Sequence, residues 1–214
     1  QSMSIERAVT HFQELVRIPT ISRADEVTAD RAPFDLFIVT LERLYPLVHS
    51  ALTREVIAGH SLLFRWAGTA TDAPTVLMAH YDVVPATDDG WTHPPFDAVL
   101  VGNGDEQLIW GRGTLDDKGA LVSALEAIES QLAEGFVPAN DVYLAFGHNE
   151  ETTGAGARAI VEVLAERGIR PALVLDEGGA VVEGVFPGVT DPVAVIGVSE
   201  KGILSLTLSV TQEG

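Results

Sequence analysis

Cysteine is absent from this chain of 214 residues, and basic residues are scarce. The lack of cysteine excludes disulfides, thiolate zinc sites and cysteine nucleophiles, so any metal must be held by His, Asp and Glu side chains. Only 13 Lys and Arg residues stand against 31 Asp and Glu residues, which gives a formal net charge of -18. Because nucleic acids and anionic lipids both require basic surface, we expect neither as a partner. Most of the acidic excess fits a solvated surface.

Long uninterrupted apolar runs are also missing. No window reaches the ~18 consecutive apolar residues of a membrane span. The longest runs, such as Thr75–Ala79, fit buried strands instead, so we expect no membrane partner. No charged-then-apolar signal sequence opens the chain, which favours a cytoplasmic location. The hydrophobic content of 46% is nevertheless too high for a disordered chain, because it can offset the entropy cost of ordering.

The spacing of apolar residues predicts alternating strands and helices. Such an alternation indicates an α/β domain with a largely parallel sheet. A final alternating stretch, 203–211, predicts the opening strand of a new domain, because the residues from Gly197 to Gly202 break the pattern. The spacing predicts helices over 5–16, 33–44, 118–132 and 155–167, and strands over 52–58, 61–66, 75–79, 107–110, 142–146 and 172–175.

Polar residues directly follow several predicted strands, which is where ligands bind in open α/β sheets. His80 and Asp82 follow strand 75–79 and point the same way in an extended chain, so the carboxylate can orient the imidazole as a metal ligand. A hydrogen-bonded structural histidine is the alternative. Asp116 and Asp117 follow strand 107–110 and lead into a helix, where both can also act as caps that interact with the helix dipole.

Two further acidic pairs follow later strands. Glu150 and Glu151 lie beside glycines and outside a helix, where neighbouring carboxylates repel unless cations or hydrogen bonds compensate. Asp176 and Glu177 occupy an equivalent place after the last strand. One histidine and three acidic clusters after strands of one sheet suit zinc or, less selectively, cobalt or manganese. Since a carboxylate has two oxygens, one aspartate can bridge two ions about 3.5–4 Å apart.

These residues lie in five longer motifs, which occur in one order along nearly the whole chain. The motifs are His80–Pro85, Trp91–Phe96, Gly111–Gly119, Asn149–Gly154 and Asp176–Gly179. Together they resemble the two-zinc metallopeptidases that include carboxypeptidase S, aminoacylase, glutamate carboxypeptidase and succinyl-diaminopimelate desuccinylase. Five motifs in register make this resemblance far more specific than any one of them. The last motif is closest to the carboxypeptidase S and aminoacylase branch.

The resemblance implies a fold and a reaction. It implies a three-layer α/β/α sandwich with a mostly parallel mixed sheet over residues 1–196, followed over 197–214 by the beginning of a lid or dimerisation domain. The implied reaction is hydrolysis of an amide bond next to a free carboxylate, in a peptide or an N-acyl amino acid. Because this family often dimerises through the lid, we expect that a full-length parent can form a homodimer.

Metal ligands follow from the resemblance residue by residue. It implies that His80 and Asp176 bind one zinc ion, that Glu151 binds the other, and that Asp116 bridges both. Whether Asp176 or Glu177 is the ligand in the last acidic pair stays open.

Two further residues are implied to act beside the metals. Asp82 orients His80. Glu150 is the general base that removes a proton from the metal-activated water and passes it to the leaving amine, since a carboxylate that is near the ions but does not ligate them can collect a proton. The resemblance also implies a cis peptide bond at Asp116–Asp117.

The C-terminal part of the family pattern has no counterpart in this chain. In the family, the second zinc takes its last ligand from a histidine far toward the C-terminus, and a histidine of the lid helps to polarise the scissile carbonyl. We therefore expect this chain to be the N-terminal portion of an enzyme. The alternative is a catalytically incompetent domain that binds at most one zinc ion well. A metal-free interaction module is disfavoured, because it need not keep Glu150 and Glu151 beside His80, Asp116 and Asp176.

The remaining basic residues give weaker signals. His93 and His148 lie in or beside the motifs and are candidates for supporting the site or contacting substrate. Lys118 and Lys201 are the only lysines, and both lie in matched segments, where arginine is not an equivalent replacement. His11, His49 and His60 are expected at the surface or at its boundary.

Overall fold

The computed structural model describes residues 5–25, 30–199 and 206–212. The chain forms two compact units, which comprise residues 1–177 and 178–214. The predicted boundary after residue 196 lies inside the second unit and stays a prediction. In the described ranges, no helix is both long enough and apolar enough to cross a membrane.

Most elements lie where the apolar spacing predicts them. The exceptions are short: one helix of six residues and several strands of two or three residues carry too little periodicity to be recognised. The helices are α1 (Ile5–Val16), α2 (Ala32–Leu44), α3 (Pro46–Ala51), α4 (Lys118–Ala133) and α5 (Ala155–Glu166), with a 3-10 turn η1 (Gly104–Glu106). The strands are β1 (Thr53–Ile57), β2 (Ser61–Trp66), β3 (Ala70–His80), β4 (Val99–Val101), β5 (Leu108–Trp110), β6 (Asn140–Gly147), β7 (Leu173–Leu175), β8 (Val181–Val182) and β9 (Val193–Ala194).

The main sheet of the first unit has the strand order β1-β2-β6-β3-β7. β2 is antiparallel to both β1 and β6, whereas β3 is parallel to both β6 and β7. All strands except β2 therefore run in one direction, which confirms the predicted mostly parallel mixed sheet. His80 pairs with Gly147 at the carboxyl ends of β3 and β6, so the residues that follow these two strands leave the sheet at the same edge.

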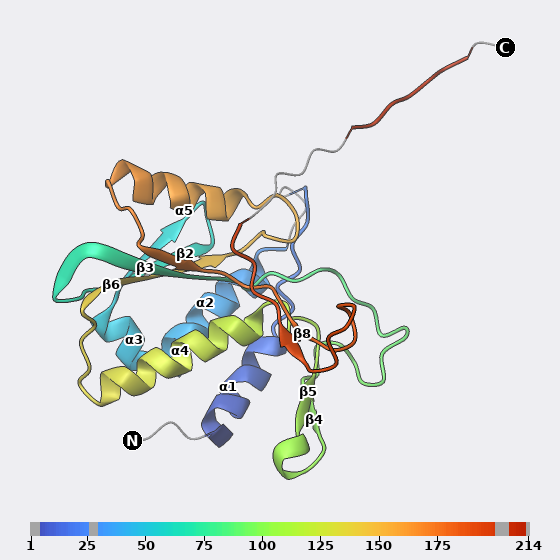
Figure 1. The fold of residues 1–214 in the computed structure, drawn as a ribbon, viewed down its shortest axis with the longest axis horizontal. Coiled ribbons are helices and arrows are strands. Elements are labelled where there is room, and N and C mark those ends of the chain that lie inside the picture. Colours follow the sequence, from blue (N-terminus) through green and yellow to red (C-terminus); the bar gives the residue numbers. More distant parts are fainter. Residues whose placement is uncertain (1–4, 26–29, 200–205, 213–214) are drawn as a thin grey trace. The chain divides into compact units, whose positions relative to one another are not determined.

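Helices cover both faces of this sheet. Side chains alternate between faces along a strand. Leu62 and Phe64 of β2 belong to a core shared with α1 to α4, whereas Leu63 belongs to a second core shared with Ile160 and Leu164 of α5. Figure 1 shows α5 on one side of the sheet and α2, α3 and α4 on the other. The predicted three-layer α/β/α sandwich is thus confirmed.

One predicted strand does not belong to the main sheet. β5 pairs with β4 in a separate antiparallel ribbon, in which Leu100 lies opposite Ile109. Asp116 therefore does not follow a strand of the main sheet, contrary to the expectation that all the acidic clusters do. The physical reason is local, because β4 lies only a short loop away from β5 and closing a short loop costs little entropy.

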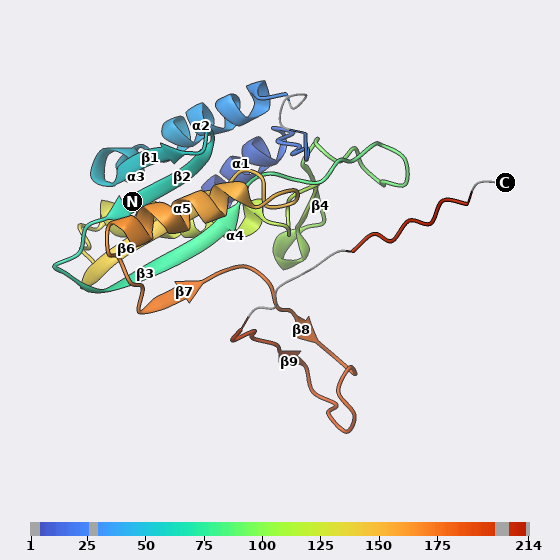
Figure 2. The same ribbon diagram turned by 90° about the horizontal axis from the view of Figure 1, so that it is seen from above.

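The second unit contains the antiparallel pair of β8 and β9, in which Val181 lies opposite Ala194 (Figure 2). The strand predicted over 203–211 begins outside the described residues. Its described part, residues 206–211, forms no strand. A strand is held by hydrogen bonds to a neighbouring strand, and no described segment pairs with these residues.

Candidate metal centre

His80, the last residue of β3, is the centre of the candidate site. Its side chain is buried, and Nδ1 lies 3.0 Å from the backbone oxygen of Asp82 and 3.3 Å from Oδ1 of the same residue. Because a carbonyl oxygen can only accept a hydrogen bond, Nδ1 carries the proton in this contact. In the neutral imidazole, Nε2 then carries the lone pair that a metal ion needs.

Asp82 is fully buried and also holds the turn that follows β6. Its two carboxylate oxygens accept hydrogen bonds from the backbone N–H groups of Glu150, at 3.0 Å, and Glu151, at 3.1 Å. Burial favours the neutral carboxyl, but hydrogen bonds from His80, Ser22 and the Glu150 backbone stabilise the charge and lower the pKa of Asp82 below its ordinary value. One carboxylate therefore fixes both the imidazole and the acidic turn.

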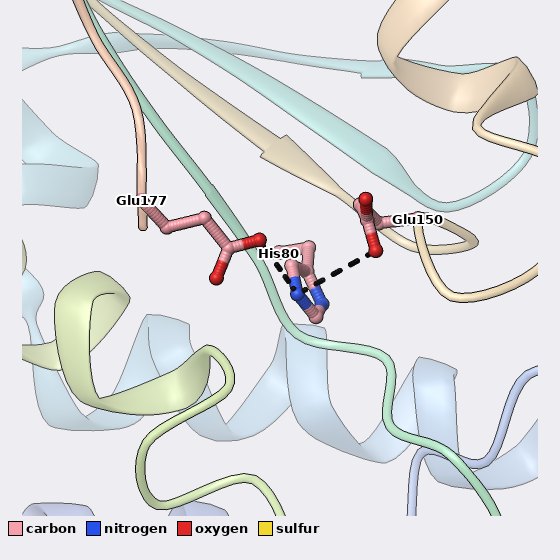
Figure 3. A group of neighbouring side chains, drawn as sticks. All are labelled: His80, Glu150 and Glu177. Atoms are coloured by element: carbon pink, nitrogen blue, oxygen red, sulfur yellow. Dashed lines mark ion pairs between the residues drawn. The ribbon is translucent and has the colours of Figure 1, made fainter. Parts of the chain in front are cut away.

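Carboxylates from three separate segments converge on Nε2 of His80. Asp116 Oδ1 lies 2.9 Å from this nitrogen, Glu177 Oε1 lies 3.1 Å from it, and Glu150 Oε2 lies 3.9 Å from it. Figure 3 shows Glu150 and Glu177 approaching the imidazole from opposite sides. Asp116 comes from the loop before α4, Glu150 follows β6, and Glu177 follows β7.

This gathering of negative charge shifts the pKa values of the groups involved. Burial opposes protonation of His80, but the surrounding carboxylates of Asp82, Glu177 and Asp116 prevail and raise the pKa of His80 to about 10. Burial, with added repulsion from neighbouring acids, raises the pKa of Glu177 to about 7. Burial and the charge of Asp116 also raise the pKa of Glu151. The site therefore favours a positive charge at its centre, which a bound cation can supply in place of a proton.

Two groups of donor atoms are close enough to hold an ion. His80, Glu150 and Glu177 form one group, and His80, Asp116 and Glu151 form the other. Within each group the candidate ligand atoms lie within 4.8 Å of one another. Imidazole nitrogen and carboxylate oxygen are donors that zinc accepts, so the residues present fit a zinc ion.

The loop that carries Asp116 is fixed by its two buried neighbours. The Asp116–Asp117 peptide bond is cis, as the resemblance implies. Asp117 is buried, and its Oδ2 accepts a hydrogen bond from the backbone N–H of His80 at 3.2 Å. Burial raises the pKa of Asp117 to about 6. Lys118 is fully buried, and burial lowers its pKa to about 7.

Lys118 ties this loop to the end of α1. Its Nζ donates hydrogen bonds to the backbone oxygens of Leu15, at 3.1 Å, and Ile18, at 2.6 Å. The chain that follows continues to Thr20, whose backbone oxygen accepts a hydrogen bond from the N–H of Val83 at 2.9 Å. Lys118 therefore supports the segment that runs beside Asp82. The sequence marks Lys118 only as a rare lysine in a motif, and nothing local reveals partners 100 residues away.

The structure brings together most of the residues that the sequence proposes. His80, Asp82, Asp116, Glu150 and Glu151 meet as described above. Asp176 belongs to neither donor group; its Oδ1 accepts a hydrogen bond from the N–H of Glu177 at 2.9 Å, while the Glu177 side chain faces His80. Of the pair that the sequence left open, Glu177 is thus the residue in contact with the imidazole. The assignment of Asp176 as a ligand stays a prediction.

The two candidate histidines outside the donor groups have other neighbours. The ring of His93 packs edge-on against Trp110, with centroids 5.5 Å apart. Nδ1 of His148 lies 2.7 Å from the hydroxyl oxygen of Ser61. Neither residue belongs to the candidate metal groups found among the described residues.

Comparison with known proteins assigns a family. The chain matches the model of peptidase family M20/M25/M40 over residues 76–212. It is 40% identical over 213 residues to the N-fatty-acyl-amino acid synthase/hydrolase PM20D1 of Xenopus tropicalis, which covers 97% of this chain and 40% of that protein. It is 40% identical over 200 residues to the probable carboxypeptidase S-like 2 of Dictyostelium discoideum, which covers 91% of this chain and 38% of that protein. The chain thus spans about two-fifths of the length of these curated relatives.

Solved structures share the fold at low identity. The dipeptidase Dug1p of Saccharomyces cerevisiae aligns with a TM-score of 0.63 at 19% identity over 86% of this chain and 43% of that one. The M20 family metallo-carboxypeptidase Sso-CP2 of Sulfolobus solfataricus aligns with a TM-score of 0.59 at 22% identity over 83% of this chain and 38% of that one. These likenesses establish the α/β fold, whereas the family model covers more than half of the sequence. The chain belongs to peptidase family M20/M25/M40.

Proposed function

We propose that this chain supplies the N-terminal catalytic portion of a metal-dependent hydrolase that cleaves amide bonds in peptides or N-acyl amino acids. The observation that carries the proposal is the convergence of Asp116, Glu150 and Glu177 on Nε2 of the buried His80. The names of the relatives, a carboxypeptidase S-like protein and an N-fatty-acyl-amino acid synthase/hydrolase, support both substrate kinds.

Two zinc ions per complete active site are proposed, with cobalt or manganese as less selective alternatives. As the resemblance implies, His80 would help to hold one ion and Glu151 the other, and Asp116 would be shared between them. Glu177 would serve as the ligand of the last acidic pair, in place of or beside Asp176, because Glu177 faces the imidazole. When bound, zinc lowers the pKa of water toward ~7 and polarises the carbonyl oxygen of the substrate.

Glu150 is the proposed general base. Asp82 accepts a hydrogen bond from the backbone N–H of Glu150. The carboxylate of Glu150 lies farther from Nε2 of His80 than the carboxylates of Asp116 and Glu177 do. This side chain is therefore near the donor atoms yet less engaged with them. It can remove a proton from the attacking water and deliver that proton to the leaving nitrogen of the amide.

A second candidate function is metal binding without turnover. It is favoured by the span of the chain, which covers about two-fifths of the curated relatives. His80 is also the only histidine in the two donor groups found in the described part of the chain. In this alternative, a further histidine ligand and the lid that would begin at residue 197 must come from additional sequence. The same lid would carry the homodimer contact of the parent protein.

Metal analysis combined with a hydrolysis assay tests the proposal. The 214-residue chain and the longest natural chain that contains it would both be assayed with dipeptides and N-acetyl amino acids. We expect zinc in both chains, hydrolysis by the longer chain, and zinc without hydrolysis in its Glu150→Gln variant. Absence of metal from both chains would overturn the proposal, and so would full turnover by the Glu150→Gln variant.

A further inference from the structure

A small cavity lies where the turn between β1 and β2 meets the end of β6. Because β2 and β6 are antiparallel neighbours, His60 and His148 come together at the edge of the sheet that also carries His80. Both histidines line this α2 cavity, together with Arg31 and Phe34 at the start of α2. The ring of Phe34 packs against both imidazoles, with centroids 5.6 and 6.3 Å away. The cavity volume of about 50 Å³ has room for a few waters, since one water needs ~10–15 Å³.

The lining of the α2 cavity concentrates basic groups in an acidic protein. Arg23, Arg31, His60 and His148 all belong to it, and none of its described residues is acidic, although acidic residues outnumber basic ones by 31 to 13 in the chain. Of the hydrogen bonds and ion pairs made by the described residues, none involves the guanidinium of Arg23 or Arg31. Elsewhere the arginines that pair with a carboxylate are Arg7, Arg43, Arg54, Arg65 and Arg167. The two cavity arginines therefore offer their charge to a ligand.

Two acidic residues near the start of α2 lie outside the cavity lining and have other contacts. Asp30 Oδ1 accepts a hydrogen bond from the backbone N–H of Ala32 at 3.1 Å. Asp35 Oδ1 lies 3.0 Å from Nε2 of His60, and the side chain of Asp35 is 71% exposed. Asp35 thus orients the imidazole of His60, and neither carboxylate neutralises the arginines.

Buried polar side chains give the cavity a fixed floor. Ser22, His148 and Asn149 line it and are all buried. Nδ1 of His148 lies 2.7 Å from the hydroxyl oxygen of Ser61, and Oδ1 of Asn149 accepts a hydrogen bond from the N–H of Gly156 at 2.9 Å. A Cβ atom at Gly156 would lie 2.0 Å from Oγ of Ser61, so only glycine fits there. These groups are held in place before any ligand arrives.

The cavity is separate from the candidate metal centre. It lies on the β2 side of β6, whereas His80 lies on β3 at the opposite side, which is roughly 10 Å away at two strand spacings. In an N-acyl amino acid the carboxylate carbon is only about 2.5 Å from the amide nitrogen. A carboxylate next to an amide bond at the metal centre therefore does not reach Arg23 or Arg31. The ligand of the cavity is a second molecule.

We propose that the α2 cavity binds phosphate, either as the free anion or as a monoester. Phosphate carries more charge than a carboxylate and presents more acceptor oxygens, which suits a lining with donors on several sides. A guanidinium can bind two of these oxygens at once, and a neutral or a charged imidazole can donate to another. The site is independent of the proposed hydrolysis and gives the chain an anionic ligand in addition to its substrate.

Histidine signals in proton NMR spectra report on the cavity without turnover. Inorganic phosphate is titrated into the 214-residue chain at constant pH and ionic strength. Zinc is first removed with a chelator, so that phosphate cannot bind to a metal ion. Of the six histidines, we expect saturable shifts of the ring signals of His60 and His148, while those of His11, His49 and His93 stay in place. Acetate at equal concentration should have little effect.

Three arginines provide matched variants. Arg31→Gln and Arg23→Gln should each weaken phosphate binding at least about tenfold, because each removes charge-assisted hydrogen bonds. Arg170→Gln removes the same charge from an exposed arginine outside the cavity lining and should bind phosphate as wild type does. All three variants should keep the wild-type circular dichroism spectrum, since these side chains are exposed.

The same titration can overturn the proposal in three ways. Absence of saturable shifts would do so, as would equal phosphate affinity in the Arg31→Gln and Arg170→Gln variants. Acetate that binds as tightly as phosphate would show a general anion site instead of a phosphate site. A titration with glycerol 3-phosphate separates the two sources of the ligand. Equal or tighter binding of glycerol 3-phosphate would support a monoester, and binding of inorganic phosphate alone would support the free anion.

Discussion

Two sets of charged side chains meet around His80, and they differ in burial and in the groups they contact. The buried set consists of Asp82, Asp117 and Lys118, none of which exposes more than 1% of its surface. All three bind backbone groups of other segments: Asp82 and Asp117 accept from backbone N–H groups, and Lys118 donates to backbone oxygens. These contacts fix where segments lie relative to one another.

The second set faces solvent. The side chains of Asp116, Glu150 and Glu177 are 64%, 52% and 27% exposed, and all three approach Nε2 of His80. The contrast teaches that the site divides two tasks. Buried charges hold the geometry, while exposed carboxylates remain available to a cation, to water and to substrate. Substitutions in the two sets should therefore have separable effects on stability and on chemistry.

The largest effect is expected from Glu150→Gln, which belongs to the exposed set. Loss of the general base should lower kcat about 10²–10⁴-fold in the longest natural chain. The free energy of unfolding should change by less than about 0.5 kcal/mol, because the side chain is exposed. Steady-state kinetics and urea denaturation measure the two quantities. If Glu150→Gln strongly lowers the free energy of unfolding and leaves kcat intact, the exposed set does not differ from the buried set in its task.

The second effect concerns the buried set. Asp82→Ala removes the acceptor of the backbone N–H groups of Glu150 and Glu151, and should lower the free energy of unfolding by about 3 kcal/mol. Asp82→Asn keeps one acceptor oxygen and should cost about half as much. Urea denaturation of the 214-residue chain checks both values. Equal, small effects in the two variants would show that Asp82 does not hold the turn.

Lys118→Met should have the next largest effect. It keeps the length of the buried side chain but leaves the backbone oxygens of Leu15 and Ile18 without their donor, which should lower the free energy of unfolding by about 2 kcal/mol. Arg158→Met serves as the control, since Arg158 is also basic and donates to a backbone oxygen, but is exposed. Thermal denaturation should separate the two variants. Equal midpoints of thermal denaturation in the two variants would show that Lys118 does not help the buried set to hold the geometry of the site.

The smallest effect is expected from the last acidic pair. Glu177→Gln should weaken zinc binding by about tenfold, because it removes a charge that faces His80. Asp176→Asn should have a smaller effect, since its carboxylate contacts the backbone of its neighbour instead. Calorimetric zinc titration of both variants compares them directly. If Asp176→Asn loses more zinc affinity than Glu177→Gln, Asp176 is the ligand of the pair, as the resemblance implies.

The residues of the candidate site also differ in how far the sequence alone predicts their positions. His80, Glu150 and Glu151 were predictable as a cluster, because motifs after strands of the main sheet place them at one edge of an α/β fold. Asp116 was predictable through the family resemblance, but not from its place after β5. The choice between Asp176 and Glu177 was not, because neighbouring residues in an extended segment point in opposite directions and the path of the chain after β7 decides which one faces inward. The partners of Lys118 lie on α1 and leave no periodic signal. β4 was missed because three residues carry too little alternation.

The separation of β5 from the main sheet illustrates the same limit. An apolar run predicts a strand but does not identify its neighbour, and pairing with β4 places Asp116 on a loop instead of at a strand end. Nevertheless Asp116 reaches His80, because the turn into α4 is held by Asp117 and Lys118. The position of this ligand candidate thus depends on buried residues that the motif contains but does not explain.

Calorimetric zinc titration of the 214-residue chain and of its Asp116→Asn variant shows whether the residues around His80 form a metal centre. We expect that the wild-type chain binds at least one zinc ion and that the Asp116→Asn variant binds it at least about tenfold more weakly. Asp72→Asn, an exposed acidic residue at the far end of β3, should behave as wild type. No zinc binding by the wild-type chain, or equal affinity in the Asp116→Asn variant, would contradict the assignment of a metal centre at His80.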